Sequence, residues 1–280
     1  MAPPNPAAAV PGEDRAPAGE PDAAVALARA TGLSVTVAGL LVARGLADPG
    51  AAARFLDPRL AHLTPPDGMA GRAAAAARLA DAVRRGERVV VFGDYDCDGI
   101  TATALLTETL RRLDTDVEPL LASRFDGGYG VTPAAARRIA AAAPTLLVTC
   151  DCGSSDHAVL ADLGRQGMDV VVIDHHLVPD EPLPVHAFLN PHRPDCGYPY
   201  DGLASCGLAL TLAAALRGEL GVDLDLRDTL DLVAIGTIAD VAPLDGDNRV
   251  LVRAGLARLR QPKRPGLRAL AELAALGADA

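Results

Sequence analysis

Apolar residues follow one pattern up to about residue 88 and another beyond it. Between residues 23 and 88 the chain is rich in alanine and has a helical pattern, with short breaks at DPG, DPR and TPPDG. From residue 89 onward, short continuous apolar runs alternate with helical stretches. Continuous runs rich in β-branched residues are typical of strands buried on both faces of a sheet. The pattern therefore predicts a helical N-terminal extension at 23–88 and an α/β domain at 89–260.

The α/β segment contains a regular series of predicted elements. The expected strands are ERVVVFG, DVEPLLAS, TLLVTC, DVVVID and AFLN, and the expected helices are TATALLTETLRRL, TPAAARRIAAA, SSDHAVLADLGRQG and two more near 205–217 and 226–239. Thr132 is a typical helix N-cap because a proline follows it. Strands that alternate with helices predict a doubly wound, mostly parallel sheet. The chain shows no internal repeat.

The N-terminal end of the chain has a different composition. Residues 1–22 contain six prolines and no apolar signal core, which is typical of a disordered tail. No run in the whole sequence approaches the roughly 18 apolar residues that cross a bilayer. We therefore expect no membrane segment.

Acidic residues follow three of the predicted strands. Asp94 follows VVVFG, Asp151 follows LLVTC, and Asp174 follows VVVI and precedes His175 and His176. In doubly wound sheets the ligand site lies beyond the carboxyl ends of the strands. Aspartate is common in turns, which explains any one of these positions but explains three strand ends and a histidine pair poorly. The pattern predicts a metal site.

The segment GDYDCDG adds two further carboxylates, Asp96 and Asp98. A calcium loop of the EF-hand type also begins with alternating aspartates, but it needs a glutamate at its twelfth position, which here is Leu105. The segment before these aspartates, ERVVVFG, also has the pattern of a strand, whereas an EF-hand loop is preceded by a helix. We predict a strand that ends at Gly93, an acidic turn, and a helix that begins near Thr101.

Asp240 is a fourth candidate acid. It lies at the end of an apolar stretch, within GTIADVAPL, and is expected to be partly buried. A buried carboxylate is costly unless it is paired or bound to a metal. A salt bridge to Arg249 or Arg253 is the alternative to metal binding.

Composition narrows the possible functions. Aromatic residues make up only 3% of the 280 residues and the net charge is −10, which argues against a broad basic nucleic-acid footprint, although bound divalent metals would offset part of the charge. The five cysteines are an odd number and form no framework, which favours a reduced, cytoplasmic setting. Structural zinc is disfavoured because the candidate thiols contain no C-x2-C pair; they are Cys97, Cys150, Cys152 and Cys196.

The candidate residues suit a particular chemistry. Several carboxylates with one or two imidazoles favour Mn²⁺ or Mg²⁺, and the histidines favour Mn²⁺. Two such ions about 4 Å apart would activate a water molecule and hold a phosphoryl oxygen. The predicted reaction is metal-assisted hydrolysis of a phosphate ester. Neither a G-x-S-x-G nucleophile motif nor a Walker A loop is present.

Six blocks of sequence, in order and spacing, resemble the DHH phosphoesterase superfamily. They are VFGDYDCDGITATALL, SRFDGGYG, TCDCGSS, VVIDHH, NPHRPDCGYPYDGLASCGLALTLAAAL and DLVAIGTIADVAPLDGDNRVLVRAGL. Within the superfamily they look most like the RecJ family of 5′→3′ exonucleases specific for single-stranded DNA. The likeness begins near residue 35, and it implies a role in DNA repair and recombination.

The resemblance also implies roles for individual residues. The implied ligands of two Mn²⁺ (or Mg²⁺) ions are Asp94, Asp96, Asp98, Asp151, His175 and Asp240. Asp151 would bridge both metals, and His176 would touch the scissile phosphate, so Asp151, His175 and His176 form the implied catalytic set. Arg124 and the glycine-rich segment GGYG would lie near the substrate backbone. The start of a helix at Ser205, Cys206 and Gly207 would offer N–H groups to a phosphate, and a plain cap of small residues is the alternative.

The chain departs from the family pattern mildly at Cys97, Cys150 and Ser205, and more strongly in length. RecJ-like proteins are expected to continue into a second domain and an OB-fold, so residues 261–280 would begin a helix that connects to a missing domain or calls for a partner chain. Two alternatives remain open. One is a DHH phosphoesterase of short oligonucleotides, nucleotides or pyrophosphate, and the other is a non-catalytic binding module.

Overall fold

The computed structural model describes residues 21–125 and 127–274, and the chain divides into two compact units, Met1–Pro58 and Arg59–Ala280. The predicted disordered tail lies outside the described residues except for its last two, which begin the first helix. The C-terminal part of the predicted connecting segment, 275–280, also lies outside them.

The described part of the first unit contains three helices, α1 (Pro21–Thr31), α2 (Val35–Val42) and α3 (Pro49–Leu56). The side chains of Ser34 and Asp48 cap the second and third helices. The apolar faces of the helices meet in a small core of Leu27, Ala28, Ala38, Leu41 and Ala52. Within the described residues no single helix is long and apolar enough to cross a membrane, although α1 and α2, bent by 116°, pass the same length and composition criteria as a pair.

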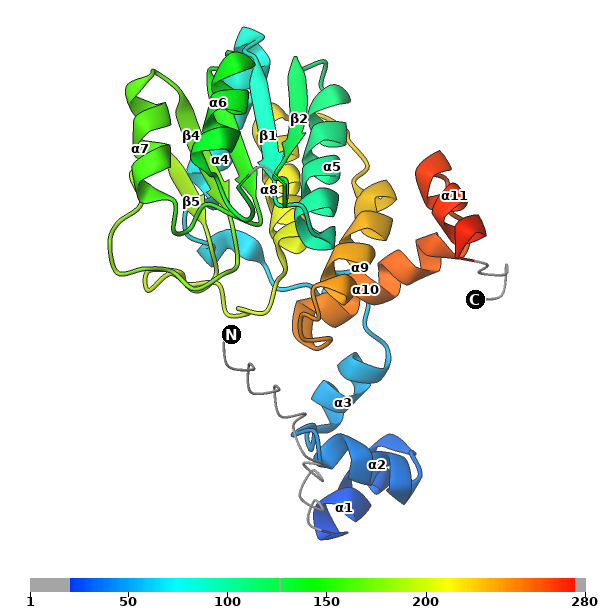
Figure 1. The fold of residues 1–280 in the computed structure, drawn as a ribbon. Helices are drawn as coiled ribbons and strands as arrows, with labels where there is room; N and C mark the ends of the chain where they lie inside the picture. Colours follow the sequence, from blue (N-terminus) through cyan, green and yellow to red (C-terminus); the bar gives the residue numbers. More distant parts are fainter. Residues whose placement is uncertain (1–20, 126, 275–280) are drawn as a thin grey trace, which may run out of the picture. The chain divides into compact units, whose positions relative to one another are not determined.

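The second unit is built on a five-stranded sheet in which every strand pair is parallel (Figure 1). The spatial order is β2-β1-β3-β4-β5. The strands are β1 (Val89–Gly93), β2 (Val117–Leu121), β3 (Leu146–Cys150), β4 (Asp169–Ile173) and β5 (Ala187–Leu189). This arrangement confirms the predicted α/β fold with a parallel sheet.

Helices cover both faces of the sheet because successive strand residues point to opposite sides. Val89 and Val91 pack into a core with α4 (Arg72–Arg85), α5 (Cys97–Arg111) and α8 (Ser205–Leu220). Val90 and Phe92 pack into a second core with α6 (Pro133–Ala141) and α7 (His157–Arg165). The other described helical elements of this unit are η1 (Leu60–His62), η2 (Pro66–Gly68), η3 (Arg227–Thr229), α9 (Leu230–Ala239), α10 (Gly246–Leu259) and α11 (Pro265–Leu273).

The structure differs from the sequence pattern at two boundaries. Helix α4 reads as part of the N-terminal extension, but it belongs to the second unit because it packs on β5 and α8. Helix α5 begins at Cys97, one turn before the predicted start near Thr101, because the Asp96 side chain accepts a hydrogen bond from Gly99 N and caps the helix. The predicted cap at Thr132 is confirmed, since its side chain accepts from Ala135 N.

Candidate metal centre

The candidate site lies at the point where the chain reverses its direction of travel across the sheet. From β1 the chain moves outward to β2 and then returns to the other side of β1 to form β3. Ligands bind at such switch points in doubly wound sheets. Asp94 and Asp151 follow these two neighbouring strands directly, so they lie at the edge where the fold itself leaves a crevice.

Backbone hydrogen bonds hold the strand-end acids in place. The N–H of Asp94 donates to Cys150 O (3.1 Å), that of Asp151 to Ile173 O (2.8 Å), and that of Asp174 to Leu189 O (3.0 Å). Asp151 has a positive φ of 64°, which is uncommon for residues other than glycine and is tolerated best by aspartate and asparagine. The sheet ladder therefore continues one residue beyond each strand and fixes the acids.

All six predicted metal ligands come together in three overlapping groups. In each group the ligand atoms lie within 4.8 Å of one another. The groups are Asp94, Asp96 and Asp151; Asp98, His175 and Asp240; and Asp151, His175 and His176. Asp151 and His175 each belong to two groups, so the groups form one continuous centre.

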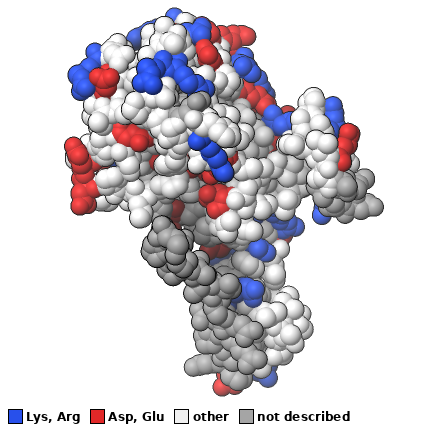
Figure 2. Space-filling view, in the orientation of Figure 1, with Lys and Arg blue, Asp and Glu red and all other residues white. Residues whose placement is uncertain are grey.

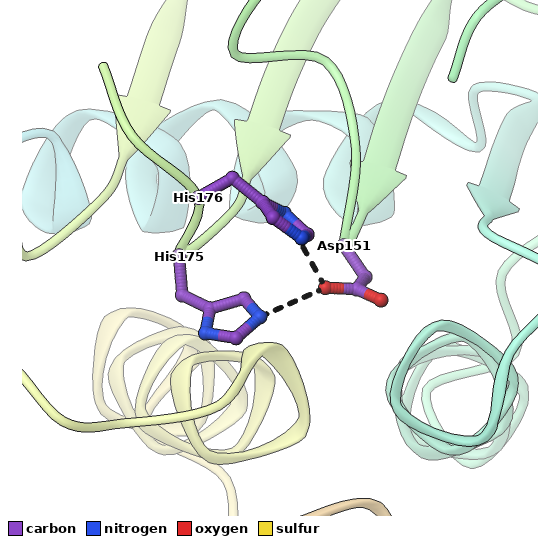
Figure 3. Close-up of side chains that lie close together, drawn as sticks. All are labelled: Asp151, His175 and His176. Carbon is purple, nitrogen blue, oxygen red and sulfur yellow. Dashed lines mark ion pairs between the residues drawn. The ribbon is translucent and has the colours of Figure 1, made fainter. Parts of the chain in front are cut away.

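The two histidines meet at the carboxylate of Asp151 (Figure 3). His175 Nε2 lies 3.2 Å from Asp151 Oδ1, and His176 Nδ1 lies 3.9 Å from the same oxygen. His175 Nε2 is also 3.9 Å from Asp98 Oδ2 and 3.8 Å from Asp240 Oδ2. Asp240, at the end of α9, thus faces the centre.

The carboxylates of the centre are in an unfavourable electrostatic setting. Burial, reinforced by the charge of Asp98, raises the pKa of Asp151 to about 8. Burial also raises the pKa of Asp94 and of Asp240. Burial opposes a charge on His175, but the carboxylate of Asp151, aided by those of Asp98 and Asp240, raises the pKa of this histidine to about 9. The centre therefore attracts positive charge.

The donor atoms of the centre fit a divalent cation. Among the described residues, the buried Oδ1 of Asp94 makes no hydrogen bond, and the buried Nε2 of His175 makes none with good geometry, although it forms an ion pair with Asp151 Oδ1 at 3.2 Å. Buried polar atoms are normally satisfied, so unpaired ones that face a cluster of carboxylates call for a further partner. Carboxylate oxygens with one or two imidazole nitrogens suit Mn²⁺ or Mg²⁺.

Asp98 is held by the N-terminus of α8. Its two oxygens accept hydrogen bonds from Ser205 N (2.6 Å) and Cys206 N (2.9 Å), and the hydroxyl of Ser205 donates to Asp151 Oδ1 (3.1 Å). Ser205, Cys206 and Gly207 are buried. The N–H groups of the first two residues therefore already bind an acid of the protein, and contact of these residues with a substrate phosphate stays a prediction.

Asp174 orients both histidines, a role that the sequence did not predict. Its fully buried carboxylate accepts hydrogen bonds from the N–H groups of Ser154 (3.0 Å), His175 (2.8 Å) and His176 (3.2 Å), and lies 2.8 Å from His176 Nδ1. Burial opposes the charge of Asp174, but the hydrogen bonds from His176 and Ser154 lower its pKa. Asp174 thus remains ionised and fixes the ring of His176.

Two further residues support His176, a role that the sequence predicted for neither of them. Asn190, which directly follows β5, donates from Nδ2 to His176 O (2.8 Å). The Tyr129 hydroxyl lies 3.1 Å from His176 Nδ1 and donates to Asp151 O (3.3 Å). The position of Asn190 one residue beyond a strand is the signal that would have pointed to it.

Arg124 is exposed and lies over the acidic turn. Its Cζ atom is 4.6 Å from the centre of the Tyr95 ring, and Tyr95 stands between Asp94 and Asp96. The side chain is therefore held beside the centre, although its contact with a substrate remains a prediction.

Helix α9 packs so closely on Asp98 that it leaves room only for a glycine at position 236. A Cβ atom at Gly236 would lie 2.9 Å from Asp98 Oδ1 and 2.7 Å from Cys206 Sγ, and it would clash with the hydroxyl of Thr101. We expect Gly236→Ala to displace Asp98 and to weaken metal binding by about 10- to 100-fold, as is usual when a group that supports a ligand is lost. Calorimetric Mn²⁺ titration measures the change.

A matched helical glycine provides the control for this substitution. A Cβ atom at Gly218 in α8 would have no other atom within 4 Å, so Gly218→Ala should leave Mn²⁺ affinity unchanged and slightly raise the melting temperature. Equal Mn²⁺ affinity in the Gly236→Ala protein and the wild type would show that Asp98 does not bind metal in the arrangement described.

The chain is similar over most of its length to known exonucleases. It is 44% identical over 208 residues to the single-stranded-DNA-specific exonuclease RecJ of Dickeya dadantii, covering 70% of this chain and 36% of the relative. It is 39% identical over 237 residues to the RecJ of Bacillus subtilis, covering 85% of this chain and 30% of the relative. The chain thus spans only about a third of the length of these relatives.

A solved structure shows the same fold. The RecJ of Thermus thermophilus, determined in complex with Mn²⁺, matches 92% of this chain and 36% of its own with a TM-score of 0.76 and 35% sequence identity. The model of the DHH family, N-terminal domain, matches residues 88–237, which include all of the candidate metal ligands except Asp240. The sheet order, the acids at its strand ends and these matches agree, and the chain belongs to the DHH family.

Proposed function

We propose that this chain is the metal-binding part of a RecJ-like exonuclease that hydrolyses phosphodiester bonds in single-stranded DNA from the 5′ end. The observation that carries the proposal is the set of overlapping ligand groups that share Asp151 and His175. The relatives are named single-stranded-DNA-specific exonucleases, and one of them was solved with Mn²⁺. A role in DNA repair and recombination belongs to the same proposal.

Two groups of residues would hold the two Mn²⁺ (or Mg²⁺) ions. Asp94, Asp96 and Asp151 would hold one ion, and Asp98, His175 and Asp240 would hold the other. Asp151 lies beside both groups, since its Oδ1 is 3.2 Å from His175 Nε2, so it is the natural bridge. When bound, such ions lower the pKa of a water molecule and neutralise charge on a phosphoryl oxygen.

His176 would stabilise the charge that develops on the phosphate. Its side chain is 48% exposed, whereas that of His175 is 17% exposed. The hydrogen bond to Asp174 occupies Nδ1 and raises the pKa of His176, which favours the form with a proton on Nε2 as well. The ring can then donate from Nε2 to a substrate oxygen while Asp174 and Asn190 hold it still.

Mn²⁺-dependent release of mononucleotides from 5′-labelled and 3′-labelled single strands tests the proposal. A 20-nucleotide strand should be digested from the 5′ end, and a blunt duplex of the same sequence should be spared. Preferential cleavage of dinucleotides or pyrophosphate would favour the phosphoesterase of small substrates instead. Absence of Mn²⁺ binding would support a non-catalytic module and contradict both.

We expect this chain to bind DNA weakly and in a salt-sensitive way. The net charge is −10, and on the face in Figure 2 basic and acidic side chains are interspersed. Several arginines of the chain are paired with acids, such as Arg88 with Asp116 and Glu118. Contacts to two or three phosphates would lower the affinity about tenfold between 50 and 200 mM salt.

Fluorescence anisotropy of a labelled 20-nucleotide strand measures this salt dependence. Submicromolar affinity at physiological salt would contradict the prediction and would show that this chain alone grips the strand. A lack of any salt dependence would contradict the involvement of phosphates.

A further inference from the structure

Three large apolar side chains protrude into solvent, and each directly follows a residue of the candidate site. Phe125 follows Arg124 and is 97% exposed, Leu177 follows His176 and is 84% exposed, and Val241 follows Asp240 and is 86% exposed. We call these three side chains the apolar rim. They come from three separate loops, so a local sequence effect does not explain why all three are exposed.

The position of Val241 is unusual for a second reason, because its backbone is strained. It has a φ of 60°, a left-handed conformation that is a genuine outlier for a β-branched residue. Its N–H bonds to Ile238 O (3.1 Å) and the N–H of Ala242 bonds to Thr237 O (3.2 Å), which is the helix ending that usually places glycine here. A strained and exposed valine beside a functional site suggests that its side chain contacts something outside this fold.

The residues that precede the rim residues in the chain lie at or beside the centre. His175 Nε2 is 3.8 Å from Asp240 Oδ2, and His176 Nδ1 is 3.9 Å from Asp151 Oδ1. Each rim residue is adjacent in sequence to a residue of the site, and adjacent Cα atoms are about 3.8 Å apart. A nucleotide whose phosphate lies at the centre would therefore bring its sugar and base towards the rim.

We infer that the apolar rim contacts the faces of unpaired nucleobases next to the scissile phosphate; this inference rests on the proposed function. Base faces bind apolar and aromatic side chains without sequence preference, and only single strands expose them. The acidic net charge leaves phosphate attraction weak, so base contacts supply a grip that charge does not. Arg124, stacked on Tyr95 beside Phe125, adds a cationic plane of the kind that favours bases.

Binding of two strands with the same phosphates isolates the contribution of the bases. A 20-nucleotide oligothymidylate and an abasic strand of the same length are compared by fluorescence anisotropy in Ca²⁺. The wild type should bind the oligothymidylate at least fivefold more tightly than the abasic strand. Each of Phe125→Ala, Leu177→Ser and Val241→Gly should reduce this ratio, and the triple variant should bring it close to one.

Val241→Gly gives the most specific test, because its expected effects on stability and on base binding have opposite signs. Glycine relieves the left-handed backbone, so the melting temperature should rise while the oligothymidylate affinity falls. Ala143→Gly is the matched control, since Ala143 also has a positive φ (50°) but precedes β3 at the far end of the strand. It should raise the melting temperature and leave the binding ratio unchanged.

Leu273→Ser controls for the loss of an exposed apolar side chain. Leu273 lies on α11 and is 85% exposed, close to the values at the rim. This variant should keep the wild-type ratio. A wild type that binds both strands equally, or rim variants that keep the ratio, would overturn the inference, leave the proposed function intact and favour a protein surface as the partner of the rim. A wild type that binds and cleaves neither strand would overturn both proposals.

Discussion

The Asp151→Asn protein should lose bound Mn²⁺ and nearly all turnover, and yet melt at a higher temperature than the wild type when metal is removed. Asp151 belongs to two of the three ligand groups, and asparagine retains its shape but not its charge. Because metal ions supply several kcal/mol of transition-state stabilisation, turnover should fall by about 10³-fold or more. Asparagine tolerates the positive φ at this position, so the backbone should not change.

The gain in stability without metal follows from the sign of the pKa shifts. The pKa of Asp151 is raised to about 8 in the folded chain, chiefly by burial, so the stability that its protonated form contributes is full at low pH and is lost as pH rises through 8. Removing the ionisable group removes this loss together with the ion pair to His175, and the loss is the larger of the two because burial raises the pKa of Asp151 in spite of that pair. We therefore expect Asp151→Asn to raise the melting temperature in EDTA by several degrees at pH 8.

His175 makes the wild type respond to pH in the same direction. Its pKa is raised to about 9, so the stability that its charged form contributes is full below about pH 6.5 and is lost as pH rises through 9. The metal-free wild type should therefore melt at progressively lower temperature between pH 6.5 and 9, and saturating Mn²⁺ should flatten this dependence.

Calorimetry measures the melting temperatures in EDTA and in Mn²⁺. Metal analysis of the dialysed proteins measures the bound Mn²⁺. Asp162→Asn is the control because Asp162 is an exposed acid that pairs with Arg165 at the surface, so its loss should change stability by well under 1 kcal/mol. An Asp151→Asn protein with wild-type metal content, or with an unchanged melting temperature in EDTA, would refute the assignment of Asp151 as a buried bridging ligand.

The strand-end acids were predictable because a parallel sheet aligns its strand ends. Once the apolar runs before Asp94, Asp151 and Asp174 are read as parallel strands, their carboxyl ends must lie at one edge. The register of the sheet shows this alignment directly, because the last residues of β1, β3 and β4 pair with one another. They are Gly93, Cys150 and Ile173. The fold and the meeting of these acids therefore follow from local patterns in the chain.

The supporting contacts were not predictable, because they depend on how distant segments pack. The N-terminus of α8 binds Asp98 from 107 residues away, and no local pattern indicates whether a helix N-terminus faces a substrate or an acid of the same protein. The hydroxyl of Tyr129 reaches His176 across 47 residues, from a loop whose course the sequence leaves open. The same limit explains why α4 was grouped with the N-terminal helices, since alanine-rich segments carry little information about their neighbours.

The two adjacent histidines should separate in their effects when each is replaced. Strand alternation alone would point the two rings to opposite faces. In the structure the alternation ends at Ile173, and both rings approach Asp151 with centres 4.7 Å apart (Figure 3). Their surroundings nevertheless differ. His175 Nε2 faces three carboxylates, whereas His176 is half exposed and is tied to Asp174.

We expect His176→Ala to keep near-normal Mn²⁺ content and to lose about 10²- to 10³-fold in turnover, which is the usual cost of removing a donor that stabilises transition-state charge. His175→Ala should lower both metal content and turnover, and high Mn²⁺ should restore part of its activity. His176→Gln serves as the conservative variant, because its amide can still donate towards a phosphate and should recover part of the lost turnover.

Metal stoichiometry and single-turnover rates, measured side by side for each variant, distinguish these roles. A histidine that binds metal loses activity in proportion to its lost metal, so excess Mn²⁺ rescues it. A histidine that contacts the phosphate loses activity at full metal occupancy, so no concentration of Mn²⁺ rescues it. If both variants lost metal equally and both recovered in excess Mn²⁺, the pair would be two ligands, and the hydrogen bond between His176 and Asp174 would then orient a metal ligand instead of a donor to the substrate.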